Sequence, residues 1–123
     1  MNIGWITLRV SNLDDSLVFY RDLLGLTVEK EFGGDEQKII FLGGKEDTKV
    51  ELLWKLGEKI ENVGKGVSIG FEVSGLDEWM RRIRESGARS ITGPFSPNPS
   101  IRFCFFSDPD GYQIQLYENL GEK

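Results

Sequence analysis

Two polar residues, Glu51 and Gln115, alternate with aliphatic residues in predicted strands. Gln115 stands between two aliphatic residues in QIQLYE, and Glu51 stands in the same place in KVELLW. Successive side chains of a strand point to opposite sheet faces, so both polar groups point away from the aliphatic side. An amide can hydrogen-bond a ligand, and a carboxylate can also exchange a proton with one. The two positions therefore mark a candidate binding or catalytic surface.

The residue types that the chain lacks narrow this chemistry. There is no histidine, and Cys104 is the single cysteine. Imidazole activates most serine and cysteine nucleophiles and is the commonest transition-metal ligand, so its absence argues against both kinds of site. Cys104 lies among phenylalanines and is expected to be a buried thiol. Acid–base chemistry is left to carboxylates, lysine or tyrosine, and no cofactor is expected.

Charge and hydropathy indicate the class of partner. A net charge of −5 and a pI near 4.8 argue against nucleic acid or a membrane as a partner. Neither a transmembrane segment nor a secretory signal is recognisable, so we expect a cytoplasmic protein. The 123 residues suffice for one domain with a substantial core. The expected partner is a small-molecule ligand.

An internal repeat supplies the elements that position Glu51 and Gln115. WITLRVSNLDDSLVFYRD, which begins at Trp5, aligns with SIGFEVSGLDEWMRRIRE, which begins at Ser68, and KVELLW aligns with QIQLYE. Each of the two long segments reads as an alternating strand followed by a helix with an apolar stripe. Further strands are expected after each helix, at 27–32, 37–42, 49–54, 89–92, 102–106 and 113–117.

Capping residues mark the ends of both helices. Asn12 is predicted to cap the first helix, and Ser74 with Gly75 is predicted to cap the second. Gly25 and Gly87 are expected to end the two helices. The apolar stripes that should pack on a sheet are Leu13, Leu17, Tyr20 and Leu24 in the first helix, and Leu76, Met80 and Ile83 in the second.

The predicted fold class is α+β. Two tandem β-α-β-β-β modules should form a curved mixed sheet around a cleft, with the helices on the outer face. Module 1 is about 1–56, the linker about 57–66 and module 2 about 67–123, within a single domain. The Pro-rich stretch 92–100 is expected to be a loop, and the charged stretch 81–85 a solvated helix face.

Alternation places four residues on the cleft side, where pseudo-twofold symmetry should bring them together: Trp5, Glu51, Ser68 and Gln115. Trp5 could stack on a ligand or merely plug the cavity. Glu51 could act as a general base or bind a ligand amine, or it could simply be held by Arg9 or Gln115. Ser68 and Gln115 could bind a ligand, or they could satisfy one another.

Four further residues are candidates for the walls of the cleft. Arg9 and Glu72 occupy equivalent places in the repeat. The favoured interpretation is an ion pair that joins the modules, and the alternative is that Arg9 binds a ligand anion. Trp54 and Tyr117, at the ends of the last strands, could wall the cleft or belong to the core. The D-P-D-G sequence at 108–111 is explained by turn chemistry.

These segments resemble the vicinal oxygen chelate superfamily, which includes glyoxalase I, extradiol dioxygenases, fosfomycin-resistance enzymes and bleomycin-resistance binding proteins. The resemblance rests on ITLRVSNLDDSLVFYRDLLGL, VSIGFEVSGLDE and FFSDPDGYQIQLYE, and it covers nearly the whole chain. Metal-dependent members would place their ligands at Trp5, Glu51, Ser68 and Gln115, where only Glu51 is retained. The resemblance therefore implies this fold without the usual metal chemistry, and a homodimer is the expected assembly.

The leading hypothesis is a metal-free small-molecule binding protein, similar to the bleomycin-resistance branch, that sequesters a planar or aromatic compound. A second hypothesis is a metal-independent lyase or isomerase with Glu51 as its general base. A third is a divergent member with a plugged cleft and a role in interaction. The expected ligand-binding residues are Trp5, Arg9, Glu51, Trp54, Ser68, Gln115 and Tyr117.

Overall fold

The computed structural model describes residues 1–121 and divides the chain into two compact units, Met1–Asn62 and Val63–Lys123. The boundary between the units lies within the stretch 57–66 that we expected to be a linker. The last two residues of the expected module 2, Glu122 and Lys123, lie outside the described residues.

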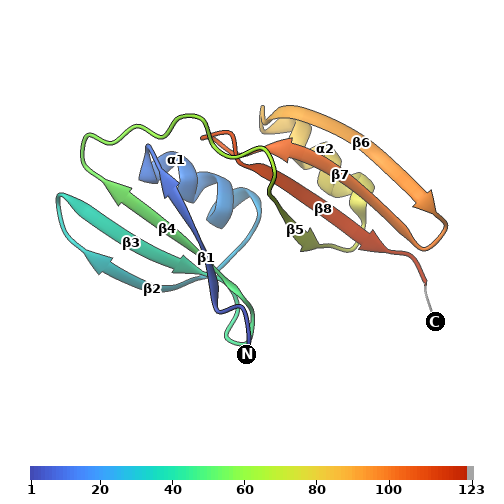
Figure 1. The fold of residues 1–123 in the computed structure, drawn as a ribbon. Coiled ribbons are helices and arrows are strands. Elements are labelled where there is room, and N and C mark those ends of the chain that lie inside the picture. Colours follow the sequence, from blue (N-terminus) through green and yellow to red (C-terminus); the bar gives the residue numbers. More distant parts are fainter. Residues whose placement is uncertain (122–123) are drawn as a thin grey trace. The chain divides into compact units, whose positions relative to one another are not determined.

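The first unit is a four-stranded mixed sheet with one helical segment. The strand order is β1-β4-β3-β2, in which β1 runs parallel to β4 and the other neighbours are antiparallel. Its elements are β1 (Trp5–Val10), α1 (Leu13–Leu17), η1 (Val18–Leu23), β2 (Val28–Gly33), β3 (Gln37–Leu42) and β4 (Lys49–Lys55) (Figure 1).

The second unit repeats this arrangement. The strand order is β5-β8-β7-β6, again with the first and last strands parallel. Its elements are β5 (Ser68–Glu72), α2 (Leu76–Glu85), β6 (Arg89–Asn98), β7 (Ile101–Ser107) and β8 (Gln113–Asn119). The predicted α+β class and the two β-α-β-β-β modules are therefore confirmed.

Each sheet buries one face against its own helix. In the first unit Val10, Leu42 and Leu52 are fully buried, and in the second Ile114 and Leu116 are. These residues alternate along their strands with half-buried or exposed side chains, as one-sided packing requires. The helix residues that meet these faces include Phe19 and Tyr20 in the first unit and Leu76, Met80 and Ile83 in the second.

The first helix differs from its predicted pattern. Only Tyr20 of the four expected stripe residues is fully buried, while Ser16 and Phe19 are buried as well. From Val18 onward the segment is π-helical, and the Leu24 amide donates to the Phe19 carbonyl at 3.0 Å. This wider turn changes which side chains face the sheet, and the simple 3.6-residue pattern does not anticipate it.

The first predicted cap is confirmed, and the second is right in position but wrong about the group that caps the helix. The side-chain oxygen of Asn12 accepts a hydrogen bond from the Asp15 amide at 2.9 Å, as expected. At the second helix Gly75 is the N-cap and has no capping side chain of its own. Instead the Glu118 carboxylate, from β8, accepts hydrogen bonds from the amides of Gly75 and Leu76 at 2.8 and 3.2 Å. A carboxylate at this position also suits the positive end of the helix dipole.

The Pro-rich stretch 92–100 is not a simple loop, which corrects our expectation. Most of it belongs to β6, which pairs with β7 in a register that shifts at Thr92 and Phe95. Since β6 is the edge strand of its sheet, its prolines interrupt no ladder on the outer side. The Pro-rich stretch therefore still pairs with β7, in a register that shifts along the strand.

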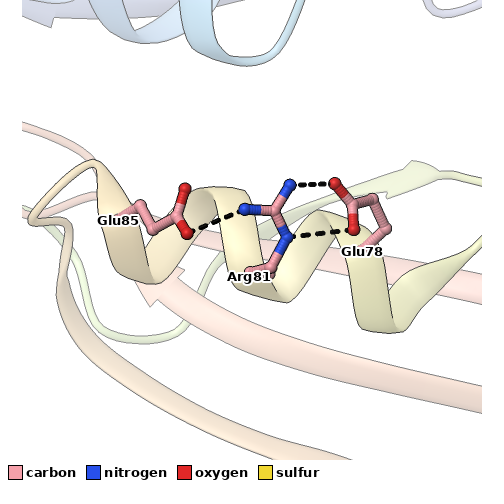
Figure 2. Close-up of polar contacts among 3 residues, drawn as sticks. All are labelled: Glu78, Arg81 and Glu85. Carbon is pink, nitrogen blue, oxygen red and sulfur yellow. Dashed lines mark hydrogen bonds and ion pairs between the residues drawn. The ribbon is translucent and has the colours of Figure 1, made fainter.

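The charged stretch of α2 is a solvated face, as predicted. Arg81 lies between Glu78 and Glu85 and forms an ion pair with each, as Figure 2 shows. Its hydrogen bond to Glu78 lowers the pKa of that carboxyl. All three side chains are more than half exposed, so the pairs contribute little to stability. Within residues 1–121, no helix is long and apolar enough to cross a membrane.

The Glu118 cap yields a test. Replacing Glu118 with alanine should lower the free energy of unfolding by about 1 kcal/mol, because two amide groups at the start of α2 lose their acceptor. Ser74→Ala is the matched control, and its effect should stay within about 0.5 kcal/mol. Urea unfolding followed by circular dichroism measures both values. A larger loss for Ser74→Ala than for Glu118→Ala would contradict the observed cap.

Candidate functional site

The candidate surface of the first unit is the sheet face that its helix does not cover. The register pairs Thr7 with Glu51 between β1 and β4, and Glu51 with Phe41 between β4 and β3. Directly paired residues share a face, so these three side chains form a row across the sheet. Trp5 lies two residues before Thr7 on the same face and is 57% exposed. The sequence-predicted positions Trp5 and Glu51 therefore do share one surface.

Glu51 is held by a neighbour that sequence reasoning missed. The Thr7 hydroxyl donates a hydrogen bond to Oε1 of Glu51. We had considered Arg9 and Gln115 as partners of this carboxylate and had not considered Thr7. Thr7 is on the same face of its strand as Trp5 and Arg9, and this alternation was the one available signal. The signal becomes decisive only once the β1–β4 register is known.

Aromatic rings border the carboxylate. The Trp5 ring lies edge-on to Phe41, with 5.3 Å between centroids, and Phe32 meets Phe41 in the same manner at 6.2 Å. Because Trp5 is on β1 and Phe41 is on β3, the indole reaches over β4 to make this contact. Glu51 thus lies in a row with a hydroxyl on one side and an aromatic wall on the other.

The two charged residues of the repeat each have a partner within their own unit. Arg9 forms an ion pair with Glu58, and the pair is partly exposed. In the second unit the amide of Asn119 donates to Glu72 at 2.8 Å. The predicted ion pair between Arg9 and Glu72 stays a prediction.

The structure corrects our placement of Trp54. It pairs with Val10 and Lys38, so it lies on the face of β4 that also carries the buried Leu52, opposite Glu51. There it lines a surface hollow together with Lys38 and residues that precede α1. The error arose because Trp54 is three positions after Glu51, and odd spacings along a strand exchange the face.

The second unit carries the other predicted residues. Gln115 pairs with Gly70 and with Phe105, and Tyr117 follows it on the same face. A Cβ atom on Gly70 would lie 3.3 Å from the side-chain oxygen of Gln115, so the glycine leaves room for the amide. Ser68 is exposed at the start of β5. The convergence of Trp5, Glu51, Ser68 and Gln115 on one centre stays a prediction.

A second aromatic cluster was also missed. Phe95, Phe103 and Phe105 contact one another with ring centroids 5.7 to 6.3 Å apart and line a largely apolar hollow. Phe105 pairs with Gln115 as Phe41 pairs with Glu51. The equivalent spacing of these two phenylalanines in the repeat was the signal that could have revealed them.

Turn chemistry accounts for the two aspartates near the end of the chain. Asp108 is buried, and its Oδ1 accepts hydrogen bonds from the amides of Asp110 and Tyr112, both at 2.9 Å. Cys104 is buried as predicted, and burial raises the pKa of its thiol. Neither feature supplies a reactive group at the surface.

The residues at the four family ligand positions do not fit a transition metal. Trp5 has no lone pair to offer, Ser68 and Gln115 offer neutral oxygens, and Glu51 alone is anionic. Thr7 moreover already donates to one oxygen of that carboxylate. Within residues 1–121, no group of three or more His, Cys, Asp or Glu residues could hold a metal ion. No chemical step is therefore assigned to a metal here.

Comparison with known proteins places these observations in a family. A family model described as Glyoxalase/Bleomycin resistance protein/Dioxygenase superfamily matches residues 2–116. A probable lactoylglutathione lyase of Synechocystis is 32% identical, over 94% of this chain and 94% of its own length. The lactoylglutathione lyase of Haemophilus influenzae is 31% identical, over 100% of this chain and 96% of its own length.

A solved structure agrees with these relatives. The trypanothione-dependent glyoxalase I of Leishmania major has a TM-score of 0.83 and 26% sequence identity, over 96% of this chain and 86% of that one. These findings overturn our leading hypothesis of a metal-free binding protein that sequesters a ligand. That hypothesis is wrong because the relatives that match almost the whole chain carry the names of enzymes.

The contact between Trp5 and Phe41 can be measured. In a double-mutant cycle, Trp5→Ala and Phe41→Ala should show a coupling of about 0.5–1.5 kcal/mol in the free energy of unfolding, as edge-on aromatic pairs do. Trp54→Ala is the matched control, since Trp54 lies on the opposite face, and its effect should be additive with that of Phe41→Ala. Additivity of Trp5 with Phe41 would contradict the observed contact.

Proposed function

Because this chain belongs to the Glyoxalase/Bleomycin resistance protein/Dioxygenase superfamily, we propose that it is an enzyme of the lyase or isomerase type. Its proposed substrate class is a small α-hydroxy thioester such as lactoylglutathione, the compound named in its relatives. The observation that carries this proposal is the Glu51 carboxylate, which Thr7 holds beside an aromatic wall on the uncovered sheet face.

The chemistry of lactoylglutathione defines what the protein must supply. The compound is a thioester with a hydroxyl group on the carbon next to the carbonyl. Its cleavage requires that the proton on this carbon be removed and that a proton be returned to the former carbonyl carbon. The resulting hemithioacetal then releases the glutathione thiol and leaves a ketoaldehyde. A side chain that can accept and return one proton is therefore needed at the reacting carbons.

Glu51 is the residue that we propose for this proton transfer. Its equivalent in the second unit, Gln115, is an amide and cannot accept a proton at neutral pH. An amide can nonetheless donate a hydrogen bond to a substrate oxygen, which is the role that we propose for Gln115. Ser68 and Tyr117 are proposed as further hydrogen-bonding contacts on the surface of the second unit.

Recognition of the tripeptide is proposed to involve Arg9 and Trp5. The glutathione part of the substrate carries two carboxylates, and a guanidinium is suited to bind a carboxylate with two parallel hydrogen bonds. Arg9 is about half exposed and pairs with Glu58, so a substrate carboxylate would have to compete with that partner. The exposed Trp5 indole offers an apolar contact beside Glu51.

We also propose that the chain is a single domain and that it forms a homodimer. Its proposed location is the cytoplasm. The exposed aromatic side chains of Trp5 and Phe32 in the first unit, and of Phe95 in the second, support an assembly that covers some of them. The acidic pI supports a small-molecule substrate over nucleic acid. Sedimentation equilibrium across a range of protein concentrations tests the assembly.

Glu51→Gln should lower kcat on lactoylglutathione by at least about 100-fold, because general acid–base catalysis contributes factors of this order. The glutamine oxygen can still accept the Thr7 hydrogen bond, so the fold should be kept. Release of the glutathione thiol measures turnover. Each assay is run with a chelator and again with added Mg²⁺, Mn²⁺, Ni²⁺ or Zn²⁺.

The control is Glu31→Gln. Glu31 is a carboxylate on β2 that forms an ion pair with Lys38. This variant should retain the wild-type kcat. Wild-type protein that fails to cleave lactoylglutathione under all of these conditions would refute the proposed substrate. Equal turnover by the wild type and Glu51→Gln would refute the role of Glu51.

A further inference from the structure

We infer that Thr7 is a positioning residue that orients Glu51 for proton transfer, an inference that rests on the proposed function. The Thr7 hydroxyl donates to Oε1 of Glu51, and the two residues are direct partners in the parallel ladder between β1 and β4. The hydroxyl therefore acts on the carboxylate from the adjacent strand.

The geometry leaves one carboxylate oxygen for chemistry. Oε1 of Glu51 accepts from Thr7, whereas no protein group among residues 1–121 donates to Oε2. A threonine on a strand has a restricted χ1 angle, so its hydroxyl is fixed more firmly than a longer polar side chain would be. Fixing Oε1 limits rotation of the carboxylate, and Oε2 is the oxygen that we assign to proton transfer.

The internal repeat provides an independent observation. The position equivalent to Thr7 is Gly70, and it pairs with Gln115 as Thr7 pairs with Glu51. A hydroxyl thus accompanies the carboxylate, while the amide of the second unit has a glycine beside it. If the hydroxyl served only to support the sheet, the repeat would have equal reason to keep it in both units.

The test compares three variants of the full chain. Thr7→Val keeps the shape and removes the donor, and Thr7→Ser keeps the donor. Thr48→Val is the matched control, because Thr48 donates at 2.8 Å to the backbone carbonyl of Ile3 and not to Glu51. Thr7→Val should lower kcat on lactoylglutathione about tenfold or more with little change in KM, since a hydrogen bond to a charged group is lost at the reacting side chain.

Thr7→Ser and Thr48→Val should both stay within about twofold of the wild-type kcat. A purely structural role for Thr7 would predict no rescue by serine and a matching loss of thermal stability. Wild-type kcat in Thr7→Val, or equal loss of kcat in Thr7→Val and Thr7→Ser, would overturn the inference.

A second measurement separates failure of the inference from failure of the proposed substrate. The ¹³C resonance of the Glu51 carboxyl carbon, assigned with the Glu51→Gln variant, should shift in Thr7→Val and remain in place in Thr7→Ser and Thr48→Val. If the wild type does not cleave lactoylglutathione but this pattern is seen, the substrate is wrong and the Thr7 contact stands. If the resonance does not respond to Thr7→Val, the positioning role is refuted whatever the turnover.

Discussion

The parallel pairing of the first and last strands of each module is the constraint on which the rest of the structure depends. β1 runs beside β4, and β5 beside β8, in the same direction. A tight turn cannot join parallel neighbours, so the chain must leave the sheet and cross over before it returns. In each unit the crossover carries a helix and two antiparallel strands. The helix covers one face of the sheet, and the opposite face carries the polar residues Glu51 and Gln115.

The same pairing decides which side chains reach that face. Leu8 and Leu52 are direct partners and both are buried under the helical segment. Thr7 and Glu51 each precede one of these leucines, so they must meet on the other side of the sheet. A slip of one residue in this register would expose the leucines and bury the carboxylate, at a cost in both apolar burial and charge desolvation. Core packing therefore fixes the Thr7–Glu51 contact indirectly.

Features that rest on local pattern could be predicted from the sequence, and features that rest on register or on distant partners could not. Alternation and helix-ending glycines sufficed for the order of strands and helices. The Glu118 cap could not be foreseen, because the carboxylate comes from a strand far along the chain and only the parallel β5–β8 pairing brings it to Gly75. Thr7 was missed for the same reason.

Function was misjudged because individual residues were given more weight than the whole chain. The substitutions at Trp5, Ser68 and Gln115 suggested a scaffold that had lost its chemistry. Similarity over the full length to proteins named lactoylglutathione lyase overturns that interpretation. The missing metal ligands identify the metal chemistry that these residues do not support. They give no information about chemistry that depends on other residues, such as a hydroxyl beside a carboxylate.

The duplicated module shows how the central polar group can be a carboxylate in one unit and an amide in the other without a change of fold. In both units a phenylalanine on the neighbouring strand is the direct partner of the central polar residue. Phe41 pairs with Glu51, and Phe105 pairs with Gln115. Glutamate and glutamine have nearly the same shape, so the apolar frame can stay constant while the polar group changes from an acceptor of protons to a donor of hydrogen bonds. The neighbouring strand then differs accordingly, with a hydroxyl beside the carboxylate and a glycine that leaves room for the amide. Because the fold depends on the aliphatic face, the polar face of each unit is free to specialise separately.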